Sequence, residues 1–443
     1  MSISPARTTA FDVLLQVERE DAYASELLLA PKYLPLSPED HGLATQIVMG
    51  VLRWRAQLDA TLTSSSSRPL PKLDAEVRTA LRMGAYQLMH LERVPSHAAV
   101  HESVELVKRA RKTSAAGLVN ALLRKVPRRV PRNAPDTTQG LAEQYSHPEW
   151  LVSRWVECFG LESARAICGS NQQVPGTSIR MAESAGPSEE VARELLQEGV
   201  HLAGGALLAS ARRVEAGDIA RTKAFRDGRV MVQDEASQLV ALLAGQGSRI
   251  LDSCAAPGGK TMVLAERNTA ATIVAMELHR HRARLLRSRI LAPNVYVVAG
   301  DLRAAPFCAT FDCVLLDAPC SGTGTLAQHP EIKWKIQPEN IAELQALQVS
   351  LLRAAMGLVA PGGSLLYSTC SLECEENEEV VTQAMLDAAG FRVADLSQRL
   401  LQLKNAGLLA IAETPALTSG PYLRTLPGVH PCDGFFAALL EKI

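Results

Sequence analysis

The chain has 443 residues, of which 47% are hydrophobic and 21% charged, and its formal net charge is −1. This length indicates two or three domains. No apolar run approaches the roughly 20 residues that span a bilayer, and the first residues lack the apolar segment of a signal peptide. We therefore expect a soluble, cytoplasmic protein that makes no contact with a membrane.

The nine cysteines lie scattered between Cys158 and Cys432. An odd number without regular spacing argues against a disulfide framework, and the absence of paired CxxC motifs argues against a structural zinc site. We expect no bound metal. The cysteines are then either core side chains or reactive thiols.

A local basic block contrasts with the neutral average. Nine basic residues and no acidic ones occur between positions 108 and 132: Lys108, Arg109, Arg111, Lys112, Arg124, Lys125, Arg128, Arg129 and Arg132. Such a block attracts a phosphate backbone. A solvated helix face followed by a linker would give the same composition, and that alternative stays open.

Residues 1 to about 130 have the pattern of a helical domain. Ser4-Pro5 and Ser37-Pro38 each place a capping hydroxyl before a proline suited to a first helical turn. Leu43, Ile47, Val51, Trp54 and Leu58 recur at helical spacing. The remaining expectations are helices over 73–91, 96–110 and 114–126, a break at Val94-Pro95, a serine loop over 64–67, and a linker marked by Pro127, Pro131 and Pro135.

The middle and C-terminal parts have different patterns. Between residues 140 and 229 we expect a small α/β module, with helices over 148–159 and 188–198 and strands around Ile179 and Leu207-Leu208. From residue 230, short apolar strands over 249–251, 273–276, 295–298, 313–316 and 364–367 alternate with helices, including 283–291 and 341–358. This alternation predicts a parallel, doubly wound sheet, which binds ligands at the carboxyl ends of its strands.

Polar motifs follow three consecutive strands of that sheet. Small residues and glycines over 252–261 would let the backbone approach a ligand at a helix N-terminus. A phosphate-binding loop would need glycine where Cys254 stands, and a plain tight turn is the remaining alternative. Glu277 could accept from a ribose diol, and Asp301 from an adenine amino group, although each could instead bond locally to the backbone. Together they indicate a nucleoside-containing cofactor.

Two further strands each run into a cysteine. Asp317-Ala318-Pro319-Cys320 follows the fourth strand, and Thr369-Cys370-Ser371 follows the fifth. We expect both thiols to face one crevice. For Cys308 and Cys313 the simpler interpretation as buried apolar side chains is preferred. A nucleophilic thiol needs a positive environment, which Lys260 or Lys333 could supply.

These residues resemble the bacterial Sun/RsmB-type 16S rRNA cytosine-5 methyltransferases. The likeness rests on 254–261, 317–320, the segment His329-Pro330-Glu331-Ile332-Lys333-Trp334, 368–371 and the closing strand at 433–436. The resemblance implies an all-α NusB-like RNA-binding domain over 1–132 and a small α/β domain related to RNA-recognition motifs over 140–229. It also implies an α/β Rossmann-like methyltransferase domain, dependent on S-adenosylmethionine, over 230–443.

The resemblance also implies roles for individual residues. Cys370 would be the nucleophile that adds to carbon 6 of a cytosine, Cys320 would help release the adduct, and Asp317 would hydrogen-bond the base. The implied cofactor is S-adenosyl-L-methionine, bound by Cys254, Ala255, Ala256, Pro257, Gly258, Gly259, Lys260, Glu277, Asp301 and Asp317. Glu277 stands where the family more often has aspartate, and Ala327-Gln328 replaces two arginines that close relatives often carry.

The implied substrate is cytosine 967 of 16S rRNA, free or in early assembly particles, with the enzyme acting as a monomer. Another rRNA or tRNA cytosine, or a non-catalytic RNA-binding assembly factor, remains as an alternative. A binding protein would need neither Cys320 nor Cys370. A P-loop ATPase is disfavoured by Cys254 and by the lack of an evident Mg²⁺ partner.

Overall fold

The computed structural model describes residues 3–20, 22–33, 35–66, 68–128, 136–182, 186–290, 292–386, 388–411 and 417–443. The chain forms two compact units. The N-terminal unit comprises residues 1–174 and 326–335, and the C-terminal unit comprises residues 175–325 and 336–443. Several residues used in the predictions lie outside the described ranges: Ser67, Arg129, Pro131, Arg132, Pro135 and Leu291.

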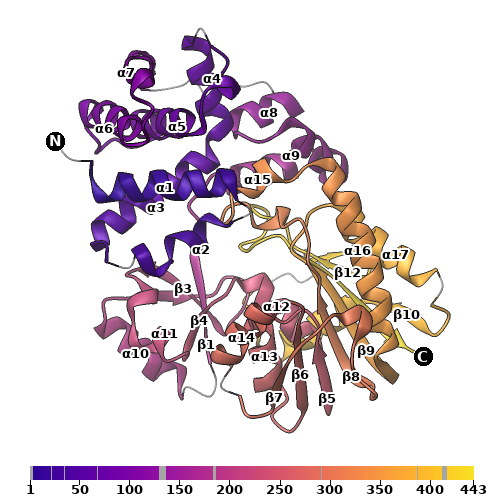
Figure 1. Ribbon diagram of the computed structural model, residues 1–443. Coiled ribbons are helices and arrows are strands. Elements are labelled where there is room, and N and C mark those ends of the chain that lie inside the picture. The colour runs from indigo at the N-terminus through magenta and orange to yellow at the C-terminus, as the bar shows by residue number, and fades with distance from the viewer. Residues whose placement is uncertain are drawn as a thin grey trace. The chain divides into compact units, whose positions relative to one another are not determined.

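The described residues of the N-terminal unit are helical (Figure 1). The helices are α1 (Pro5–Arg19), α2 (Ala24–Leu28), η1 (Pro31–Tyr33), α3 (Pro38–Arg53), α4 (Arg55–Ser65), η2 (Leu70–Lys72), α5 (Ala75–His90), α6 (Ser96–Arg109), η3 (Thr113–Ala115), α7 (Ala116–Leu123), α8 (Thr138–Gln144), α9 (Glu149–Asn171) and α15 (Ile332–Lys335). Their apolar faces share one core that includes Phe11, Ile47 and Leu81. The helical character predicted for this region is therefore confirmed.

Two local predictions in this unit are wrong. Ser37 caps α3 as expected, because its hydroxyl accepts from the Asp40 N–H at 3.1 Å, but Ser4 does not cap α1. The Ser4 hydroxyl instead donates to Glu102 at 2.7 Å. The loop predicted over 64–67 is also wrong at its start, because Ser64 and Ser65 form the end of α4. The Ser64 hydroxyl donates to the Thr61 carbonyl within this last turn.

The helix predicted over 148–159 is longer in the structure. As α9 it continues to Asn171, past a break at Gly160, whose φ of 79° is left-handed. Both α8 and α9 belong to the N-terminal unit. The boundary between the compact units at residue 174 therefore does not coincide with the predicted domain boundary at residue 140.

A short segment from late in the sequence, 326–335, packs inside the N-terminal unit. Arg53 donates to the Ala327 carbonyl at 2.8 Å, and the Trp334 ring N–H donates to the Leu52 carbonyl at 2.7 Å. Glu331 accepts from the Ala24 N–H at 2.8 Å. These bonds hold α15 against the ends of α2 and α3.

Lys333 is buried at the centre of this packing. Its side chain is 1% exposed, and its Nζ donates to the carbonyls of Arg53 and Ser146, both at 3.0 Å. Burial lowers its pKa to about 7. Lys333 therefore ties 326–335 to the end of α3 and to the connection between α8 and α9, and its ammonium is committed there rather than to a catalytic thiol.

The buried lysine predicts a pH-dependent stability. In the unfolded chain the pKa of a lysine is about 10.4, so between pH 7 and 10 the unfolded state binds more protons at Lys333 than the folded state does. Stability then rises with pH in this window. Relative to Lys333→Met, the wild type should gain about 2 to 3 kcal/mol from pH 7 to pH 9. Paired thermal melts at both pH values measure this gain, and a pH-independent gap would contradict the burial of a titrating amine.

The C-terminal unit begins with a small antiparallel sheet of order β2-β3-β1-β4. Its elements are β1 (Thr177–Met181), α10 (Ser188–Gln197), β2 (His201–Gly204), β3 (Ala211–Ala216), η5 (Ile219–Arg221), α11 (Lys223–Arg226) and β4 (Val230–Val232). The strand at Ile179 and the helix over 188–198 are confirmed. The strand predicted at Leu207-Leu208 is wrong, because both N–H groups donate to the buried Glu235 carboxylate and Leu208 makes only an isolated bridge to Leu409.

The larger sheet has nine strands in the order β11-β12-β13-β9-β8-β5-β6-β7, with β10 paired to β13. The strands are β5 (Arg249–Asp252), β6 (Thr272–Glu277), β7 (Val295–Ala299), β8 (Phe311–Asp317), β9 (Val359–Thr369), β10 (Phe391–Ala394), β11 (Thr418–Ser419), β12 (Tyr422–Arg424) and β13 (Phe436–Lys442). From β9 to β7 the strands are parallel, as predicted, whereas β13 runs antiparallel to β9. The sheet is therefore mixed. From β5, successive strands β6 and β7 are added on one side, whereas β8 and β9 are added on the other side of β5.

Helices cover both faces of this sheet (Figure 1). They are α12 (Glu235–Leu243), α13 (Gly259–Arg267), α14 (Arg280–Arg289), α16 (Pro338–Gly357), α17 (Glu378–Met385) and α18 (Leu396–Asn405); η6 (Leu302–Ala304), η7 (Thr323–Thr325) and η8 (Cys374–Glu376) are short turns. Alternate strand residues face opposite layers. Ile250 packs with α12, α13 and α18, and Leu251 packs with α16 and α17. This packing on both faces holds the carboxyl ends of the strands in place, and with them the polar residues that follow.

Some classes of feature are absent from the described ranges. No helix there has the length and apolar character to cross a membrane. No group of three His, Cys, Asp or Glu side chains within those ranges is placed to hold a metal ion. All nine cysteines fall inside them, and all are free thiols. Cys313 is buried as predicted, whereas Cys308 is exposed, so the prediction that it is buried is wrong.

Candidate active site at the carboxyl ends of the parallel strands

Two cysteine thiols meet where β8 and β9 end. Because these neighbouring strands are parallel and Asp317 lies opposite Ser368, the loops that follow them start side by side. The Sγ atoms of Cys320 and Cys370 are 3.3 Å apart. The hydrogen bond with Cys370 and burial raise the pKa of Cys320 well above its usual value. Cys320 is therefore a thiol, not a thiolate, at neutral pH.

A lysine–aspartate pair lies beside the thiols. Lys260, in the first turn of α13, donates to Asp317 Oδ2 at 2.7 Å, and Ser368 donates to Asp317 Oδ1 at 2.9 Å. Burial lowers the pKa of Lys260, but Asp317 and the neighbouring Cys370 raise it, and the net shift is upward. Lys260 is therefore a cation that can stabilise negative charge on Asp317 and on Cys370 together. Each carboxylate oxygen retains a second lone pair for a ligand.

A buried carboxylate joins the two cysteine loops. Glu376 is fully buried, and its Oε1 accepts from the Ser321 N–H and from Gln348 Nε2, both at 2.8 Å. Its Oε2 accepts from the hydroxyls of Ser321 and Ser371, the residues that directly follow Cys320 and Cys370. One side chain thus fixes the spacing of both thiols.

Close backbone contacts hold the Cys370 loop from the other side. The Gly324 N–H donates to the Cys370 carbonyl at 2.8 Å, and the Gly434 N–H donates to the Gly324 carbonyl at 2.9 Å. A Cβ at Gly324 would lie 2.1 Å from the Gly434 carbonyl oxygen, so only glycine fits this position. The C-terminal segment before β13 is therefore part of the scaffold around Cys370.

The glycine-containing loop after β5 leads into α13. Gly258 adopts a φ of 108° and precedes the first helical turn, whose N–H groups lack partners within the helix. A Cβ there would lie 2.8 Å from Leu286, so the backbone turns tightly against α14. Ala255, next in the loop after Cys254, donates its N–H to the Met276 carbonyl at 2.9 Å. Ala256 and Gly259, which are half-buried, and Pro257, which is exposed, complete this loop, where small side chains let a ligand approach the backbone closely.

The two other predicted cofactor carboxylates end β6 and follow β7. Glu277 is 5% exposed and accepts from the His279 N–H at 3.0 Å, so it bonds locally as well as facing the strand ends. Asp301 accepts from the Arg303 N–H at 2.9 Å and pairs with its guanidinium at 2.6 Å, which lowers the pKa of Asp301. The loop edge and Glu277 fit a nucleoside with its ribose diol. Asp301 could accept a hydrogen bond from the nucleoside only in addition to its ion pair with Arg303.

Comparison with known proteins places this arrangement in a family. Residues 239–441 match the model of the 16S rRNA methyltransferase RsmB/F, 4–128 match the NusB family, and 147–217 match the ferredoxin-like domain of RsmF/B-like methyltransferases. The probable ribosomal RNA small subunit methyltransferase B of Bacillus subtilis is 33% identical over all of both chains. The chain belongs to the RsmB/F family. It is therefore an S-adenosylmethionine-dependent RNA methyltransferase.

Other members and one solved structure extend the RsmB/F likeness. The ribosomal RNA small subunit methyltransferase B of Pseudomonas putida is 34% identical over 91% of each chain. The crystal structure of the protein PH0851 covers all of both chains with a TM-score of 0.82 and 26% identity. The predicted architecture is thus confirmed: an all-α NusB-like part, a small α/β part and an α/β methyltransferase part follow one another along the chain.

In this RsmB/F chain, the environment of Lys333 and the charge of the basic block both differ from the predictions. Lys333 was a candidate for activating a thiol, but it is buried in the N-terminal unit. In the basic block, Lys108, Arg109 and Lys112 pair with carboxylates. Exposed cations remain at Arg111, Arg124, Lys125 and Arg128; Arg124 bonds to Asn120 and Arg128 to Ser96. The part of the block that the structure describes, 108–128, is therefore less positive than its composition indicates.

Proposed function

We propose that this RsmB/F protein methylates carbon 5 of a cytosine in 16S rRNA, cytosine 967 in the conventional numbering, through a covalent adduct with Cys370. The observation that supports this proposal is the 3.3 Å separation of two thiols at adjacent strand ends, beside the Lys260–Asp317 pair. Relatives named ribosomal RNA small subunit methyltransferase B support the substrate class. The RNA is free or part of an early assembly particle.

The site residues divide the reaction between them. Carbon 5 of cytosine is a weak nucleophile, so the Cys370 thiolate first forms a bond to carbon 6, and the ring π electrons move to carbon 5. Asp317 accepts from the exocyclic amine and the protonated ring nitrogen, which stabilises the charge on the base. Lys260 donates to Asp317 and places a positive charge beside Cys370.

Release reverses the addition after carbon 5 has gained the methyl group. A base removes the proton of carbon 5, the C5–C6 double bond reforms, and the sulfur of Cys370 leaves with the electron pair of the S–C6 bond. Cys320 remains a thiol because of its raised pKa, and it can donate a hydrogen bond to the leaving sulfur. The target base must leave its stack to reach this crevice, so unpaired RNA is the natural substrate.

S-adenosylmethionine supplies an electrophilic methyl group to this chemistry. The residues that would hold it are the backbone over 254–260 with Glu277 and Asp301. Lys260, in the first turn of α13 after this loop, bonds to Asp317 at the end of β8 and so links the cofactor loop to the strand that leads to Cys320.

The proposed chemistry predicts release of the hydrogen on carbon 5. With 16S rRNA transcribed from [5-³H]cytidine triphosphate, the wild type should release one tritium to water for each methyl group transferred. Methylation at the exocyclic nitrogen or at a ribose hydroxyl releases none, and would contradict the proposal. Mapping the product tests the position separately, because a modified cytosine other than 967, or one in tRNA, would overturn the target and keep the chemistry.

Glu277→Ala should weaken binding of S-adenosylmethionine by about tenfold or more, because a nearly buried carboxylate that accepts from hydroxyl groups is lost. RNA affinity should change by less than twofold. Calorimetric titration of the cofactor and filter binding of the RNA measure the two effects. Equal losses would indicate misfolding, and Glu379→Gln, an exposed acidic position in α17, is the matched control.

A further inference from the structure

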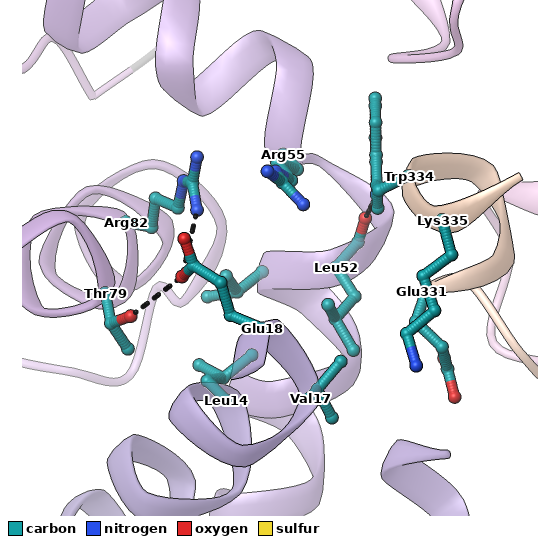
Figure 2. Close-up of a pocket in the computed structure, with 11 residues that line it drawn as sticks. Leu14, Val17, Glu18, Leu52, Arg55, Thr79, Arg82, Glu331, Trp334 and Lys335 are labelled. Atoms are coloured by element: carbon teal, nitrogen blue, oxygen red, sulfur yellow. Dashed lines mark hydrogen bonds and ion pairs between the residues drawn. The ribbon is translucent and has the colours of Figure 1, made fainter. Parts of the chain in front are cut away.

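The N-terminal unit contains a pocket of about 180 Å³ between α1, α3, α4, α5 and α15 (Figure 2). Aliphatic side chains form its floor. Its polar walls carry more cations than carboxyl groups: Arg55, Arg82, Lys335, Glu18 and Glu331, with the ring of Trp334 beside them. Burial raises the pKa of Glu331.

Two carboxylates in this region form ion pairs with arginines. Glu18 pairs with Arg78 at 2.5 Å, and Asp59 accepts from two nitrogens of Arg82 at 2.7 and 2.8 Å. Arg55 makes no ion pair or hydrogen bond within the described part of the chain. Its side chain is partly buried, and its five donors have no acceptor among the described residues.

Arg55 is nevertheless held in place. Figure 2 shows it between Arg82 and the edge-on ring of Trp334. Its guanidinium carbon lies 5.5 Å from the centre of that ring, within the range of a cation–π contact, and the bond from Trp334 to the Leu52 carbonyl fixes the ring. Burial and the positive charge of Arg82 lower the pKa of Arg55, and the carboxylates of Asp59 and Glu18 offset this only in part. An anion in the pocket would supply the acceptor that Arg55 lacks.

We propose that Arg55 binds a backbone phosphodiester of the RNA substrate in this pocket, at a site additional to the catalytic crevice. A guanidinium presents two parallel donors that match two phosphate oxygens, and the cavity is large enough for one phosphate but not for a nucleotide. The exposed cations Arg111 and Lys125 in the same unit add long-range attraction for a polyanion. Such a contact positions RNA without reading its sequence.

This inference rests on the proposed function, because RNA is the substrate there. It is tested by measuring the affinity of Arg55→Gln for a 16S rRNA transcript between 50 and 300 mM KCl. We expect about tenfold weaker binding at the low-salt end and a smaller dependence of log K on log[salt], by about 0.7 to 0.9. Arg93→Gln, which removes an exposed charge of the same unit outside the pocket, should change neither quantity as much.

Further measurements separate a phosphate contact from other roles. Arg55→Lys keeps the charge without the planar fork, so it should restore the salt dependence but recover only part of the affinity. If Arg55→Gln melts at a lower temperature, its weaker RNA binding could reflect misfolding, and Arg55→Lys then becomes the deciding variant. Inorganic phosphate alone should raise the wild-type melting temperature, and that shift should disappear in Arg55→Gln. Phosphate stabilisation without any change in RNA binding would identify a free-anion site and overturn the proposal.

Failure of this inference differs from failure of the proposed function. If the wild type methylates the transcript while Arg55→Gln keeps the same affinity and salt dependence, the pocket is not an RNA site and the catalytic proposal stands. If the wild type transfers no methyl group to RNA but Arg55→Gln still lowers the salt dependence, the catalytic proposal fails and the phosphate contact stands.

Discussion

Cys370→Ala should lose methyl transfer to RNA by about four orders of magnitude or more, whereas Cys320→Ala should accumulate a covalent protein–RNA complex. Loss of a nucleophile removes the covalent route entirely. Loss of Cys320 leaves the route to the adduct open and removes the thiol 3.3 Å from the leaving sulfur. The complex is measured as an RNA-dependent, denaturation-resistant band after incubation with S-adenosylmethionine and 16S rRNA.

The same experiment distinguishes the possible assignments of the two thiols. A band in Cys370→Ala and none in Cys320→Ala would reverse the roles. No band in any variant, with no methyl transfer by the wild type, would exclude the substrate. Cys308→Ala is the matched control, because Cys308 is exposed and lies outside the site, and it should behave as the wild type.

The positions of the two thiols were predictable from chain order. Parallel strands that are adjacent in the sheet end at one edge, so polar loops after β8 and β9 must meet there. The sequence pattern located the carboxyl ends of β5 to β9 to within two residues, because an apolar run precedes a turn there, but it placed the start of β9 five residues too late. The antiparallel addition of β10 to β13 was less predictable, since pairing between distant strands has no local signal.

Other features depend on packing that the sequence does not reveal. Lys333 lies in a four-residue helix, too short for a periodicity that would mark it as buried. The placement of 326–335 within the N-terminal unit has the same cause. Glu376 is one of several carboxylates near Cys370, with Glu373, Glu375, Glu378 and Glu379, and no spacing rule selects it among them. Only the folded backbone shows that it faces Ser321 and Ser371.

Glu376 should therefore act as a positioning residue whose loss lowers turnover without lowering cofactor affinity. It accepts four hydrogen bonds, three of them from Ser321 and Ser371. Glu376→Gln keeps the size of the side chain but replaces one acceptor oxygen by an NH₂ donor, so at least one loop must shift. A misplacement of about 1 Å at a reacting sulfur costs about 100-fold in rate. We expect kcat to fall by this order, with unchanged affinity for S-adenosylmethionine.

The trapping variant gives this prediction a second readout. In a Cys320→Ala background, Glu376→Gln should slow formation of the covalent band by a similar factor, because the sulfur of Cys370 no longer points at carbon 6. A purely structural role would lower the melting temperature and the cofactor affinity together and leave the rate per folded molecule unchanged. Glu379→Gln, one turn along α17 and exposed, should leave the rate of band formation at its wild-type value. Since Glu376 touches neither the base nor the cofactor loop in the proposed arrangement, a slower band with normal cofactor binding would arise through the residues that Glu376 holds beside the thiols: Ser321, Ser371 and Gln348, which also bonds to Pro319.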